Sequence, residues 1–174
     1  MEFMLSFLAA DRFHYTPLKM RYLFVFSGLI IVVVQGGLIR ELAPVYGEKA
    51  LAITGLLVVI PGFVLVTFAA REGMLYLGIG FMAFGSALIT PSASALVSLY
   101  TPSDRQGSIL GIFRSLGALA RAVGPLLACA AYWRFGSRAA YGLGAALILA
   151  PLCTAFFLPA LSRDELNSSP DSKA

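Results

Sequence analysis

Residues 105–133, RQGSILGIFRSLGALARAVGPLLACAAYW, decide the fold class of this chain. The stretch is apolar and long enough to cross a bilayer, since a spanning helix needs about 20 mostly apolar residues. It also carries Arg114 and Arg121, which are seven residues apart, about two helical turns, and therefore share one helix face. A charge at the centre of a spanning helix costs about 2.5–3.5 kcal/mol on insertion scales, so it is retained mainly where it faces protein, water or an opposite charge. Transport of a polar or charged solute through a membrane is therefore the leading hypothesis.

The composition of the whole chain supports the membrane class. Of its 174 residues, 59% are hydrophobic and 13% are charged, and the mean hydropathy is +0.83. Soluble domains have about 45–50% apolar and about 25% charged residues. The net charge of +4 is spread over the chain without a basic run, so the sequence shows no nucleic-acid patch and we expect no nucleic acid among its partners.

Five segments have the length and apolar character of membrane spans, namely residues 18–37, 50–70, 74–100, 106–133 and 139–161. Short polar connections separate them, so consecutive spans are expected to be antiparallel neighbours. Residues 1–13, MEFMLSFLAADRF, are too short to span and lack the features of a signal peptide, so we interpret them as the end of a further helix. The sequence thus predicts an all-α membrane protein with five full transmembrane helices plus the end of a sixth in residues 1–161, and a disordered polar tail in residues 162–174.

Small residues inside the predicted spans indicate close helix packing. Gly78 and Gly85 mark one face of the third span, and Gly107 and Gly111 form a GxxxG pair in the fourth. In lipid, such residues let two backbones approach each other. We therefore expect these faces to lie against neighbouring helices.

Prolines inside the spans favour bent helices. Pro91 and Pro125 each remove a helical hydrogen bond, and Gly124 precedes Pro125 directly. Membrane helices tolerate such prolines where another group satisfies the freed carbonyl. Ser92 and Ser94 follow Pro91 and are candidates either for that role or for lining a polar path. We interpret Pro91, Gly124 and Pro125 as candidate helix-bend or gating positions.

Three interpretations of Arg121 stay open on the residues alone. In the first, it has a structural role and pairs with a carboxylate or with backbone carbonyls, as a bolt between helices. In the second, it is a cavity cation that binds an anionic or polar substrate group. In the third, it is part of a conformational switch at a domain interface. Glu2 is the carboxylate expected at membrane depth, so a Glu2–Arg121 pair is a hypothesis, and Gln35 is a further polar candidate. Arg114 is a fourth candidate, although it is close enough to the span's end to extend its head group to the interface.

The turn TPSDRQG, residues 101–107, precedes the arginine-bearing span. Ser103 and Asp104 are candidates to cap the helix that follows, an ordinary role for these residue types. Arg105 is a secondary candidate for a gating salt bridge.

Enzyme chemistry is not indicated. The sequence shows no nucleophile–base set, no phosphate-binding loop and no metal-ligand cluster. Cys129 and Cys153 lie in predicted spans, where a thiol behaves as a small hydrophobe, and the lone His14 cannot form a site by itself. We expect no catalytic residue, no metal and no cofactor.

Three stretches resemble the second half of a major facilitator superfamily transporter, in the drug/proton antiporter branch that includes tetracycline exporters. They are residues 35–51, QGGLIRELAPVYGEKAL, residues 89–111, ITPSASALVSLYTPSDRQGSILG, and residues 114–128, RSLGALARAVGPLLA. They are similar to the family's loop between helices eight and nine, its tenth helix with the exit loop, and its eleventh helix. The resemblance covers nearly all of residues 1–160 and implies that the five spans are helices eight to twelve, with the tail in the cytoplasm.

The resemblance also implies roles for several residues. Glu2 falls where this branch often has an acid and would be a proton or counter-charge site, while Arg121 would be a cavity cation or an interface bolt. The family binds substrate near the midplane between two halves and rocks one half against the other. Pro44 and Val45 depart from the basic residues that relatives tend to carry in this loop, which puts its gating charge network in doubt.

The expected function is transmembrane transport of a small organic solute, a drug or organic anion, as part of a longer proton-coupled or facilitative carrier. The alternative is a half-size or non-transporting membrane protein that homodimerises or regulates a full-length relative. The expected partners are the lipid bilayer, the small organic solute, and either a missing N-terminal half or a second copy. The sequence predicts a multi-pass membrane protein without indicating whether its membrane is the plasma membrane or an organelle's.

Overall fold

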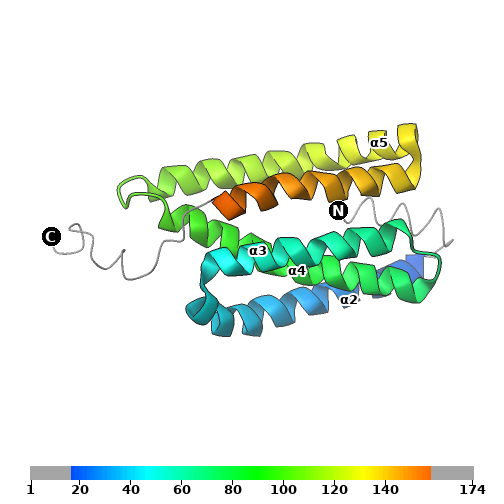
Figure 1. Cartoon of the computed structure of the whole chain (residues 1–174), viewed down its shortest axis with the longest axis horizontal. Coiled ribbons are helices and arrows are strands. Elements are labelled where there is room, and N and C mark those ends of the chain that lie inside the picture. The colour runs from blue at the N-terminus through cyan, green and yellow to red at the C-terminus, as the bar shows by residue number, and fades with distance from the viewer. Residues whose placement is uncertain (1–16, 158–174) are drawn as a thin grey trace.

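The computed structural model describes residues 17–157, without the side chains of residues 17, 137–145 and 156. The chain forms α2 (Pro17–Val33), the π-helix η1 (Val34–Leu38), α3 (Ile39–Thr67), α4 (Glu72–Leu99) and α5 (Gln106–Phe157) (Figure 1). No strand occurs in this part of the chain, and the all-α prediction is confirmed. Glu2, the predicted helix end at residues 1–13 and the predicted tail at residues 162–174 lie outside the described residues.

Two glycines interrupt the long helices. Gly47 has φ 78° and ψ 157° within α3, and Gly136 has φ 79° and ψ 170° within α5. Side-chain-bearing residues adopt this backbone region only under strain, so glycine is required where the chain must leave one helix and enter the next. In Figure 1, α5 runs out as one arm, residues 106–136, and returns beside it as a second arm, residues 137–157.

The structure has helices of membrane-spanning length, and the predicted count of five spans stays a prediction. In the described residues, three helices are long and apolar enough to cross a membrane, Leu18–Thr67, Glu72–Leu99 and Gln106–Gly136, and a shorter apolar helix covers Ala146–Ala155. One prediction is wrong in detail, because residues 40–46 of the expected polar connection are helical. The helix persists there until Gly47, the residue whose positive φ redirects the chain.

Helices α3 and α4 form the tightest contact, along a seam of four glycines. A Cβ atom built on Gly85 would lie 2.6 Å from the carbonyl oxygen of Gly55, and one built on Gly62 would lie 3.0 Å from that of Gly78. The predicted Gly78–Gly85 face therefore packs against a matching pair on the antiparallel neighbour. The predicted packing of Gly107 is not observed, because a Cβ there would meet nothing within 4 Å.

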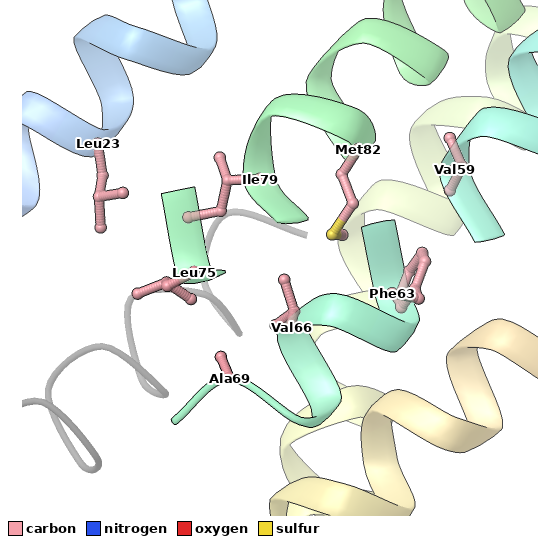
Figure 2. Packing of buried hydrophobic residues seen from close by; sticks show 8 residues of the cluster. All are labelled: Leu23, Val59, Phe63, Val66, Ala69, Leu75, Ile79 and Met82. Atoms are coloured by element: carbon pink, nitrogen blue, oxygen red, sulfur yellow. The ribbon is translucent and has the colours of Figure 1, made fainter. Parts of the chain in front are cut away.

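The hydrophobic core lies between α2, α3 and α4. Figure 2 shows its main cluster, whose buried members are Leu23, Val59, Phe63, Val66, Ala69, Leu75, Ile79 and Met82. Ile148 of the α5 return arm packs against this cluster. By contrast, none of the residues in the most apolar stretch of the α5 outgoing arm is buried. The arm that carries both arginines therefore stands outside the core.

Candidate functional site

Arg121 occupies the midpoint of the α5 outgoing arm, the 31-residue segment Gln106–Gly136. A straight helix places it about 22 Å from either end. Because the hydrocarbon core of a bilayer is about 30 Å thick, the Cα of Arg121 falls near its middle when this arm spans it. The location of Arg121 at membrane depth stays a prediction, which the midpoint position in this arm supports.

The helix face around the two arginines is nearly free of large side chains. Arg114 and Arg121 are both exposed. The residues three or four positions from them on this face are Leu110, Gly111, Gly117, Ala118, Gly124 and Pro125, of which Leu110 is the one large side chain. Among the described residues, neither arginine forms an ion pair or a side-chain hydrogen bond. The two guanidinium groups are thus open to an anion, to water or to residues outside the described range.

Gln35 lies in the π-helix η1, on an exposed position. Isolated π-helical turns inside α-helices occur frequently at functional sites. Gly36 and Gly37 follow, and a Cβ atom on either would meet nothing within 4 Å. Within the described residues, however, Gln35 makes no hydrogen bond to Arg114 or Arg121, so the structure does not join these three candidates into one cluster.

The candidate bend positions lie within uninterrupted helix. Helical dihedrals persist through Gly124 and Pro125, and the break in α5 comes instead at Gly136. The helix α4 likewise runs through Pro91. The main redirection of α5 is therefore made by glycine backbone freedom rather than by proline.

The serines after Pro91 do not act as a pair. Ser94 Oγ donates a hydrogen bond to the carbonyl of Thr90 at 3.1 Å, whereas Ser92 Oγ is buried without a hydrogen-bond partner. A proline at position 91 deprives the carbonyl of Ala87 of its usual helical donor. The hydroxyl of Ser94 is committed to the carbonyl of Thr90 rather than to that of Ala87.

Arg105 forms an ion pair with its neighbour Asp104, with Nε and Oδ2 3.4 Å apart and both side chains exposed. Exposed pairs of this kind contribute about 0–1 kcal/mol. A contact that sequence analysis missed fixes the same turn, since Gln106 Nε2 donates a hydrogen bond to the carbonyl of Ser98 at 3.2 Å. The last carbonyl groups of a helix have no donor within the helix, so a side-chain donor close to the helix end is to be expected.

A second missed contact joins the starts of α2 and α4. Lys19 Nζ lies 3.1 Å from Glu72 Oε1. The two residues are 53 positions apart, so no local spacing rule relates them. Among the described residues, no group of three or more histidine, cysteine, aspartate or glutamate side chains has the geometry to hold a metal ion.

Comparison with known proteins places this geometry in a family context. A family model described as Major Facilitator Superfamily matches residues 2–173. Mouse major facilitator superfamily domain-containing protein 10 is 38% identical over 152 residues, which are 87% of this chain and 33% of the mouse protein. Class C tetracycline resistance protein from Escherichia coli is 30% identical over 156 residues, 88% of this chain and 38% of the bacterial protein. The chain spans about a third of the length of these curated relatives.

A solved structure agrees with the sequence comparison. The crystal structure of the human organic anion transporter MFSD10 (TETRAN) superposes with a TM-score of 0.82 at 34% identity, over 88% of this chain and 37% of that one. Fold and sequence thus agree, each over close to nine tenths of the chain. The resemblance to major facilitator superfamily transporters and to tetracycline exporters is confirmed.

Proposed function

The chain belongs to the Major Facilitator Superfamily, and from this premise we propose that it forms the C-terminal half of a longer carrier that moves a small organic anion across a membrane. It is a multi-pass membrane protein by family and by its long apolar helices. Arg121 binds the anionic group of the substrate in this proposal, and Arg114 supplies a second positive charge on the same face.

The charge of Arg121, which has no partner among the described residues, carries this proposal. A guanidinium at the centre of a spanning helix is unfavourable by about 2.5–3.5 kcal/mol unless water or a counter-charge offsets it. In the described residues Arg121 has no carboxylate partner. A water-filled cavity that receives anions supplies both forms of compensation, and guanidinium matches carboxylate geometry well.

The placement of the chain within the carrier follows from the family. In these carriers substrate sites lie near the midplane between two halves. The uncovered surface of the α5 outgoing arm supports a neighbouring half on that side, because its most apolar stretch buries no residue. The similar solved structure is that of an organic anion transporter, which favours an anion over a neutral drug. Proton coupling through Glu2 is part of the proposal.

The uncovered arm also supports a second candidate, in which a second copy of this chain or a full-length relative covers it. The size of the native protein separates the two. An antibody against residues 161–174 will detect a protein about twice or more the 18.5 kDa mass of this chain if it belongs to a longer carrier. A band at the mass of this chain would instead favour the half-size protein.

Transport by the purified native-length protein in liposomes tests the function itself. Each of several aromatic carboxylates is compared with its uncharged primary amide, in the wild type, Arg121→Gln, Arg121→Lys and Arg71→Gln. Arg71 is an exposed arginine just before α4 and is the matched control. We expect carboxylate uptake to fall about ten- to hundredfold in Arg121→Gln, since hydrogen bonds to charged groups contribute about 1.5–3 kcal/mol. Equal uptake of acids and amides, or equal loss in Arg71→Gln, would contradict the proposal.

A further inference from the structure

We propose that Gly117 is a positioning residue for Arg121. Because Gly117 has no side chain, the guanidinium of Arg121 lies against its backbone, one helical turn away from the Cα of Arg121, and we call this space the seat. The inference rests on the proposed function, in which Arg121 binds the substrate's anionic group. The two residues are four positions apart and therefore neighbours on one face. A Cβ atom built on Gly117 would lie 3.4 Å from Arg121 Nη1.

This contact fixes where the positive charge lies. The arginine side chain runs back toward the start of α5, the direction in which helical Cα–Cβ bonds tilt. Four residues correspond to about 6 Å along a helix. The charge of Arg121 therefore stands at the level of Gly117, about one turn nearer to Arg114 than its own Cα.

Among the glycines of the α5 outgoing arm, only Gly117 has such a neighbour. Gly107, Gly111 and Gly124 belong to the same helix, and a Cβ on any of them would meet nothing within 4 Å. A separation of 3.4 Å is ordinary van der Waals contact, so a single methyl group fits beneath the guanidinium. A branched side chain occupies the space of the guanidinium itself and moves the charge away from the helix.

A displaced charge weakens anion binding without removing the arginine. The expected loss is about ten- to hundredfold in affinity, the range that a lost hydrogen bond to a charged group produces. At a glycine with open surroundings, the same substitution changes the affinity for the anion by about twofold or less, as substitutions at exposed positions do. Gly73, at the exposed start of α4, is such a position, since a Cβ there would meet nothing within 4 Å.

The test uses the native-length protein and fluorescein, an aromatic dianion whose binding is followed by fluorescence anisotropy. The variants are Gly117→Leu, Gly117→Ala and the control Gly73→Leu. We expect Gly117→Leu to raise Kd about ten- to hundredfold, and Gly117→Ala and Gly73→Leu to stay within about twofold of the wild type. In an Arg121→Gln background Gly117→Leu will add no further loss, because the two changes act on one interaction.

The outcomes separate this inference from the proposed function. Equal losses in Gly117→Leu and Gly73→Leu, or full additivity of Gly117→Leu with Arg121→Gln, would overturn the positioning role. Fluorescein binding that is absent, or that is unchanged in Arg121→Gln, rejects the proposed function instead. Should Gly117→Leu fail to give a monodisperse protein, Gly117→Val is used with the same expectations, since its branched Cβ also fills the seat.

Discussion

Substitution of Gly85 by alanine will destabilise the protein, because α3 and α4 meet backbone to backbone at this position. The new Cβ would lie 2.4 Å from Val59 Cγ2 and 2.6 Å from the carbonyl oxygen of Gly55. Comfortable carbon contacts are about 3.5–4.0 Å, so the helices must separate by about 1 Å. Overpacking of this kind costs about 1–3 kcal/mol, which lowers the midpoint of thermal unfolding by about 2–12 °C for a chain of this size.

The assay is thermal unfolding in detergent, followed by size-exclusion chromatography of the remaining folded protein. Gly111→Ala is the control, since its Cβ meets nothing within 4 Å and alanine is favoured over glycine in a helix by about 1 kcal/mol. Val59→Ala in the Gly85→Ala background will restore only part of the loss, because the contact with Gly55 is to backbone. A midpoint for Gly85→Ala at or above that of Gly111→Ala would refute the reasoning.

Three further predictions concern single contacts and use the same thermal assay. Ser92→Ala will leave stability unchanged or raise it by about 1 kcal/mol, because it removes a buried hydroxyl without a partner; a clear loss would show that the hydroxyl has one. Gly47→Ala will destabilise by about 1–3 kcal/mol, because φ 78° and ψ 157° are accessible almost only to glycine; a neutral result would contradict that backbone geometry. A double-mutant cycle on Lys19 and Glu72, whose side chains are 57% and 52% exposed, will give a coupling below about 1 kcal/mol that fades with salt; a larger, salt-insensitive coupling would contradict it.

The helix boundaries were predictable where an apolar segment ends at residues that terminate a helix. In the sequence, polar turns end the apolar segments before Glu72 and Gln106. In the structure, α4 and α5 begin at these two residues. The helical course of residues 40–46 was not predictable from their polarity, because hydrogen bonding within a helix continues until a residue stops it. Here that residue is Gly47, whose positive φ is a property of the backbone and not of hydropathy.

The candidate site was predictable only in part. Arg121 and Arg114 share a face because of helical period alone, so their spacing sufficed. The packing of Gly78 and Gly85 was foreseen, but their partners Gly55 and Gly62 were not, because antiparallel register between two helices is set by the loop and the core. The unpartnered hydroxyl of Ser92 was likewise beyond sequence analysis, since it depends on which side of α4 meets α3.

The central claim is that the arginine face of α5 lines a water-filled, anion-accepting cavity, and thiol labelling tests it most directly. In the native-length protein, Cys129 and Cys153, both exposed free thiols, are first replaced by serine. Single cysteines are then introduced by Ala118→Cys, on the arginine face, and by Leu119→Cys, which lies two residues before Arg121 and hence on nearly the opposite side of the helix. We predict that a membrane-impermeant thiol reagent labels position 118 rapidly, that an aromatic carboxylate but not its amide slows this labelling, and that position 119 stays unlabelled. Labelling of both positions at the same rate, or no effect of the carboxylate at position 118, would contradict the claim.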